Sequence, residues 1–120
     1  ANAVAAALRG GFRDVVLRED VPWAVYGDFS AVHILPDYAE RLPDPDEDDF
    51  VPYCGNLHKL DVKISPRLHC AFRCAMLLHG VDTLGLRGMT CAAHTDEDVD
   101  RTVEAFREAV RRLKREGLIG

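Results

Sequence analysis

The chain has 120 residues, which is enough for one domain with an ordinary hydrophobic core and too few for two. Apolar residues make up 48% of the chain and charged residues 29%, a balance that is typical of a folded domain and excludes disorder along the whole length. The formal net charge of -5 argues against a protein that binds nucleic acid or an anionic membrane through its overall charge.

We expect neither a membrane span nor an export signal. The longest uncharged apolar runs, residues 3–8 and 21–25, are far shorter than the roughly 20 residues of a membrane helix. The first residues do not resemble a signal peptide and suggest a cut within a longer chain. Four cysteines without an export signal favour free thiols in a reducing compartment, so we expect a cytoplasmic protein. They are Cys54, Cys70, Cys74 and Cys91.

The first predicted elements are a helix and two strands. Residues 1–8 are rich in alanine, and the pair Gly10 and Gly11 predicts that this helix ends there. Apolar and polar residues alternate over residues 21–35, with Gly27 near the middle of the pattern. This pattern predicts two short strands joined by a tight turn.

A long acidic loop is predicted next. Residues 36–52 hold four prolines and the acidic run 44–49, with few large apolar residues to anchor them. We expect this insertion to be solvated and mobile. The alternative is a recruitment surface for a basic partner.

The second half predicts two helices with a strand between them. Ser65 followed by Pro66 indicates the start of a helix, and Gly80 indicates its end. Residues 81–88 form a short connection, and residues 89–93 are small and apolar, as in a buried strand.

The last predicted helix carries the clearest local signal. Thr95 can cap its first turn, and Asp98 stands at the reciprocal position of a capping box. Acidic residues at its start and basic residues at its end complement the helix dipole, and Gly117 ends it. One apolar stripe is predicted along it. The stripe consists of Val99, Val103, Phe106, Val110 and Leu113.

These elements predict an α+β fold in which a short, mainly antiparallel sheet is covered by helices on one face. We expect residues 1–120 to form a single domain, with residues 36–52 as a loop insertion.

The histidines and cysteines invite a metal-site hypothesis, but their spacing does not support it. Cys70 and Cys74 would share one helix face without a second pair, so we expect buried or half-buried thiols. Cys91 and His94 are the nearest candidates for a nucleophile and its base, yet residues three apart on a strand face opposite ways. We therefore expect a structural role for His94, and a metal site remains a lesser alternative.

Arg87 is the one candidate binding residue. It lies between two glycines on the connection that leads into the last strand, where a guanidinium can reach a carboxylate outside the domain. The alternative is a solvated loop arginine. The three lysines lack the apolar surroundings that lower the pKa of a catalytic amine. They are Lys59, Lys63 and Lys114.

Residues 88–102, GMTCAAHTDEDVDRT, resemble the C-terminal signature of class III pyridoxal-phosphate aminotransferases, most closely the glutamate-1-semialdehyde 2,1-aminomutase-like branch. Residues 77–81, LLHGV, are similar to the end of a leucine-rich helix in that family, and residues 25–30, VYGDFS, are similar to its strand turn. The resemblance covers most of the chain except the acidic loop.

The resemblance implies the small C-terminal domain of a fold-type I enzyme. Such a domain packs against a large domain of the same chain that holds pyridoxal phosphate and the catalytic lysine, and the intact enzyme is expected to be a homodimer. We therefore expect no catalytic and no cofactor-binding residue in this segment, which would be inactive alone. Arg87 would bind the carboxylate of a small amino or keto acid. The rival hypothesis is a stand-alone α+β protein-interaction module without catalysis.

Overall fold

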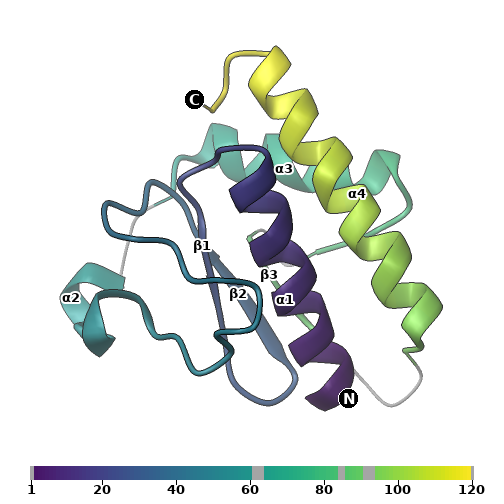
Figure 1. Ribbon diagram of the computed structural model, residues 1–120. Helices are drawn as coiled ribbons and strands as arrows, with labels where there is room; N and C mark the ends of the chain where they lie inside the picture. The colour runs from purple at the N-terminus through teal and green to yellow at the C-terminus, as the bar shows by residue number, and fades with distance from the viewer. Residues whose placement is uncertain (1, 61–63, 84–85, 91–93, 120) are drawn as a thin grey trace.

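Helical and extended segments alternate along the chain and build a mixed fold. The computed structural model describes residues 2–60, 64–83, 86–90 and 94–119 (Figure 1). Within these residues, three strands form one antiparallel sheet in the order β1-β2-β3, which confirms the predicted α+β class. The elements are α1 (Asn2–Arg18), β1 (Ala24–Tyr26), β2 (Ala31–Leu35), the 3-10 turn η1 (Pro52–Gly55), α2 (Leu57–Leu60), α3 (Pro66–Leu78), β3 (Arg87–Met89) and α4 (Asp96–Arg115).

The residues of β1 and β2 are divided between the two faces of the sheet. Val25 lies opposite Ile34, and both are buried in the main core with the helices. Ala24 lies opposite Leu35 in a second, smaller apolar cluster. We call the first face the helix face and the second the outer face. Successive residues of each strand alternate between them.

The turn between β1 and β2 requires a glycine. Gly27 has a φ of 152°, and a Cβ at this position would lie only 2.4 Å from the carbonyl oxygen of Ala31. No other residue type fits without moving the backbone. The prediction of two short strands joined by a tight turn is confirmed.

Helix α1 runs through the glycine pair that was expected to end it. The prediction of a stop was wrong, because the helix continues to Arg18. A Cβ on Gly11 would lie 2.5 Å from a methyl group of Val103 on α4, and a Cβ on Gly10 would lie 3.1 Å from the carbonyl oxygen of Pro45. The two glycines therefore let α4 and the acidic loop approach the helix backbone closely.

The main core lies where α1, α3 and α4 meet the sheet. Phe12 of α1 stacks on Phe106 of α4 with ring centroids 4.2 Å apart. Phe72 of α3 meets the edges of Phe106 and Trp23 at 6.0 and 5.7 Å. Helices α1 and α4 run side by side (Figure 1). Burial of these rings supplies much of the apolar area that drives folding.

Helix α4 begins as the sequence predicts. The hydroxyl oxygen of Thr95 accepts a hydrogen bond from the backbone N–H of Asp98 at 3.3 Å, and the Asp98 carboxylate accepts from the backbone N–H of Thr95 at 2.8 Å. Hydrogen bonding to Thr95 holds the pKa of Asp98 below its usual value. The predicted stripe faces the core, with Val103 only half-buried. The helix ends before Gly117, whose φ is 73°.

Helix α3 and strand β3 differ from expectation in detail. Helix α3 begins at Pro66 and ends before Gly80, as predicted, but Ser65 makes no side-chain capping bond. Strand β3 begins at Arg87, two residues before the predicted strand. The rest of that predicted strand, residues 91–93, lies outside the described residues.

The acidic loop packs against the protein, contrary to the expectation of a solvated excursion. Tyr38 and Phe50 of the loop, with Tyr53 directly after it, cluster on the outer face with Ala24 and Leu35. The loop thus has apolar anchors, although they are aromatic residues set apart by polar ones.

Among the residues described, no helix combines the length and the apolar character needed to cross a membrane.

Candidate functional site

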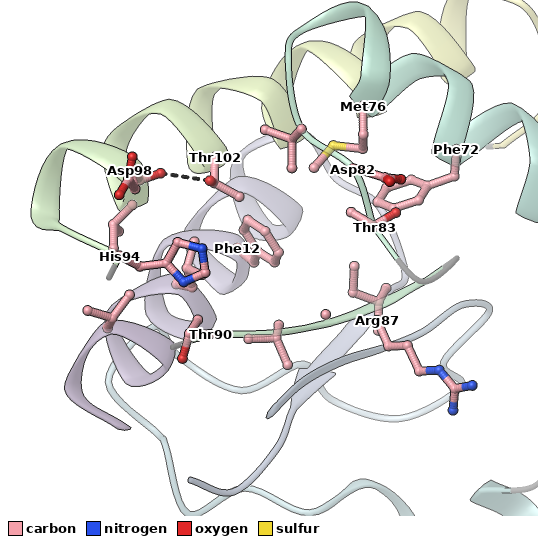
Figure 2. A pocket seen from close by; sticks show the side chains of 17 residues that line it. Phe12, Phe72, Met76, Asp82, Thr83, Arg87, Thr90, His94, Asp98 and Thr102 are labelled. Carbon is pink, nitrogen blue, oxygen red and sulfur yellow. Dashed lines mark hydrogen bonds between the residues drawn. The ribbon is translucent and has the colours of Figure 1, made fainter. Parts of the chain in front are cut away.

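A cavity of about 120 Å³ lies between the helix face of the sheet and the three long helices. Figure 2 shows Phe12 and Phe72 on its wall, from α1 and α3, with Met76 beside Phe72. The other apolar residues of the wall come from α1, β2, α4 and the segment after α3. They are Val4, Leu8, Val32, Ile34, Val81 and Val99. Such a wall suits an apolar group.

Polar residues gather at one side of this cavity. Thr90 and His94 line it between β3 and α4, and Thr102 lines it from the second turn of α4. The Thr102 hydroxyl donates to the backbone carbonyl oxygen of Asp98 at 2.7 Å (Figure 2). On the other side, Asp82 accepts from Arg73 at 3.0 Å, and this ion pair holds the pKa of Asp82 below its usual value. The rim therefore carries charged carboxylates at neutral pH.

Arg87 is exposed and turns away from this cavity. Figure 2 shows its guanidinium on the far side of the β3 backbone from Phe12 and Phe72, although its stem contributes to the cavity lining. Its partner in the sheet register is His33, and the partner of His33 on the next strand is Tyr26. The three residues thus form one row across the outer face, which we call the outer row.

The outer row places one positive charge beside two neutral rings. Tyr26 stacks on His33 with ring centroids 5.1 Å apart. Burial, reinforced by the charge of Arg87, lowers the pKa of His33, and burial raises the pKa of Tyr26. At neutral pH the charge of the row therefore resides on Arg87. Among the described residues, no carboxylate forms an ion pair with it.

The described residues do not fit a pyridoxal-phosphate site. The ammonium of Lys59 lies 5.3 Å above the ring of Tyr53 on an exposed segment, and Lys114 donates to the backbone carbonyl oxygen of Glu19. Neither amine stands in an apolar cleft of the kind that holds a Schiff-base lysine. Lys63 lies outside the described residues.

The prediction of buried or half-buried thiols was wrong for the cysteines that the structure describes. Cys54, Cys70 and Cys74 are all free and exposed. Phe72, Ala75 and Met76 form the buried side of α3, so the helix turns residues 70 and 74 away from the core. Cys91 lies outside the described residues. Within the described part of the chain, no group of three or more potential ligands is placed to hold a metal ion.

Sequence reasoning missed two arginines that the fold buries. Arg9 and Arg13 of α1 are 3% and 0% exposed, and both bind the carboxylate of Asp48 in the acidic loop. Their spacing of four residues on an otherwise apolar helix face was the available signal. It also missed the outer row, because the partners of Arg87 depend on the register of three strands.

No protein-family model and no curated protein matches this chain.

Proposed function

We propose that this chain is the C-terminal domain of a class III pyridoxal-phosphate-dependent aminotransferase or aminomutase of the cytoplasm. The observation that carries the proposal is the run 88–102, in which a short sheet strand leads into an acid-capped amphipathic helix. The α+β class and the exposed cysteines, which a reducing compartment keeps as thiols, are compatible with it.

In this proposal, a preceding large domain of the same chain holds the cofactor, which supplies an electron sink for amino-group chemistry. The proposal assigns the catalytic lysine to that large domain. The contribution of the small domain is to shape and close the substrate channel. The intact enzyme would act on a small amino or keto acid and form a homodimer.

Arg87 is the proposed ligand of the substrate carboxylate. It is exposed on the outer row, and within the described residues it has no acidic partner to compete with a substrate. In the intact enzyme, Arg87→Ala should raise KM about tenfold or more and leave kcat less affected, because a charge-assisted hydrogen bond contributes about 1.5–3 kcal/mol. Arg67→Ala, on the exposed first turn of α3, is the matched control. An unchanged KM would remove Arg87 from the site.

The test of the cofactor assignment uses the native gene product. It is incubated with pyridoxal phosphate and reduced with borohydride, and the labelled lysine is mapped by mass spectrometry. The 120-residue segment serves as the control. The proposal expects label on a lysine that precedes Ala1 and none on the segment. A folded native product without label contradicts it.

A stand-alone interaction module is the second candidate. The observation in its favour is an exposed apolar patch at the end of α3, where Leu77 and Leu78 are 48% and 66% exposed. A domain cut from a larger enzyme also exposes its former interface, so dimerisation does not separate the two candidates. Cofactor labelling does, because the module predicts none.

A further inference from the structure

The acidic loop is attached to α1 by one carboxylate and two arginines. One oxygen of Asp48 accepts from Nε of Arg9 at 2.7 Å and from Nη1 of Arg13 at 3.1 Å. The other oxygen accepts from Nη2 of Arg9 at 3.0 Å. Arg9 therefore holds the carboxylate in the two-pronged geometry that a guanidinium offers, and Arg13 adds a third hydrogen bond.

Backbone carbonyls of the β1–β2 hairpin hold both guanidiniums in place. Nη1 of Arg9 donates to the carbonyl oxygens of Phe29 and Ala31, at 3.2 and 2.7 Å. Nε of Arg13 donates to the carbonyl oxygen of Val25 at 3.1 Å. These carbonyls orient the arginines but carry no net charge. The donors are thus preorganised for an anion before the loop arrives.

The acceptor is less firmly enclosed than the donors. The side chain of Asp48 is 42% exposed, whereas those of Arg9 and Arg13 are 3% and 0% exposed. Nη2 of Arg13 is buried and finds no hydrogen-bond partner among the described residues. Asp48 lies on a segment of turns without helix or strand. Two fixed, buried cations therefore share one carboxylate that solvent can reach.

We infer that Arg9 and Arg13 form a carboxylate-binding site, which Asp48 fills as an internal ligand and which a free carboxylate enters when the loop lifts. Two positive charges held close together without an anion are unfavourable, so a carboxylate from solvent can take the place of Asp48 when it leaves. This site lies on α1 and is independent of the proposed function. Its ligand class is a small organic acid or the carboxylate group of a larger one.

Formate is the probe, because it is a carboxylate with no apolar part. Thermal unfolding is followed for the wild-type chain, Asp48→Ala and the control Asp49→Ala, in sodium formate and in sodium chloride at equal ionic strength. Asp49 is an exposed neighbour in the same acidic run. We expect formate to raise the Tm of Asp48→Ala by several degrees through binding to the folded state, and to leave the other two nearly unchanged.

Two further variants keep the result interpretable. Asp48→Asn preserves the shape of the side chain, so it reports on the site if Asp48→Ala does not fold in chloride. Asp48→Ala combined with Arg9→Gln should lose the response to formate, because the two-pronged donor is gone. The inference is overturned if neither Asp48 variant responds, or if all variants respond equally to formate.

Loop release is tested on the wild-type chain. The side chain of Arg41, within the loop, is 69% exposed and offers a trypsin site, while Arg101 on α4 is 75% exposed and serves as an internal control. Formate should accelerate cleavage at Arg41 severalfold relative to cleavage at Arg101. An unchanged ratio would show that Asp48 does not yield its place to a free carboxylate.

Discussion

The chain has two acidic segments, residues 44–49 and residues 96–98. Their side chains bind partners at very different separations along the sequence. At the start of α4, Asp98 hydrogen-bonds the backbone of Thr95, three residues away. In the loop, Asp48 binds Arg9, which lies 39 positions earlier in the sequence. The comparison shows that similar local composition supports a helix cap in one place and a tertiary contact in the other, and that only the first can be inferred from neighbouring residues.

The loop contact should be the stronger of the two. Asp48→Ala leaves two buried guanidiniums without a counter-charge, and we expect it to lower the free energy of unfolding by about 3 kcal/mol, since breaking a buried pair costs about 3–5 kcal/mol and Asp48 is partly exposed. Urea unfolding in chloride measures the change. Asp49→Ala should lie within about 0.5 kcal/mol of the wild type. Equal effects of the two variants would remove the distinction between the segments.

The glycine contact between α1 and α4 should be next in size. Gly11→Ala places a methyl group 2.5 Å from a methyl group of Val103. Overpacking costs about 1–3 kcal/mol, and an approach this close belongs at the upper end of that range; since alanine returns about 1 kcal/mol of helix propensity, we expect a net loss of about 2 kcal/mol. A double-mutant cycle with Val103→Ala should recover part of the loss. Strict additivity would show that the two residues do not press on each other.

The helix cap should be worth less than either tertiary contact. Thr95→Ala removes the oxygen that accepts from the backbone of Asp98, and a lost cap costs about 1 kcal/mol. Thr95→Ser keeps the acceptor oxygen and should lower the free energy of unfolding by only about a few tenths of a kcal/mol. Chemical unfolding of both variants separates the cap from the rest of α4. A loss as large as that of Asp48→Ala would reverse the order proposed for the two segments.

The smallest expected effect is that of acid on the contact between Asp48 and the two arginines. Hydrogen bonding to Arg9, and then to Arg13, holds the pKa of Asp48 below its usual value. A group with a lowered folded pKa stabilises the protein fully above its unfolded pKa and loses that effect as pH falls through the folded one. The difference in unfolding free energy between the wild type and Asp48→Ala should therefore be constant above about pH 5 and shrink below about pH 4. A difference that grows on acidification would contradict this assignment.

The comparison also explains what the sequence could predict. Thr95 and Asp98 signal a helix start because every group in a capping box lies within one turn. Gly10 and Gly11 gave the wrong prediction, since the same residue type serves as a helix stop and as a site of close packing. The spacing of Arg9 and Arg13 placed them on one helix face but did not show that the fold buries Arg13, because its partner lies 35 residues away. Features set by neighbours in the chain were predictable, and those set by neighbours in space were not.

The pairing of α1 with α4 affects when the chain can fold during synthesis. Arg111, near the end of α4, binds Glu19, which follows α1 and lies 92 residues earlier in the sequence. The stacked rings of Phe12 and Phe106 likewise join these two helices. On the ribosome, the core cannot close until α4 has left the exit tunnel, so α1 must wait with its apolar face uncovered. This part of the nascent chain is therefore exposed to chaperones and proteases until α4 emerges.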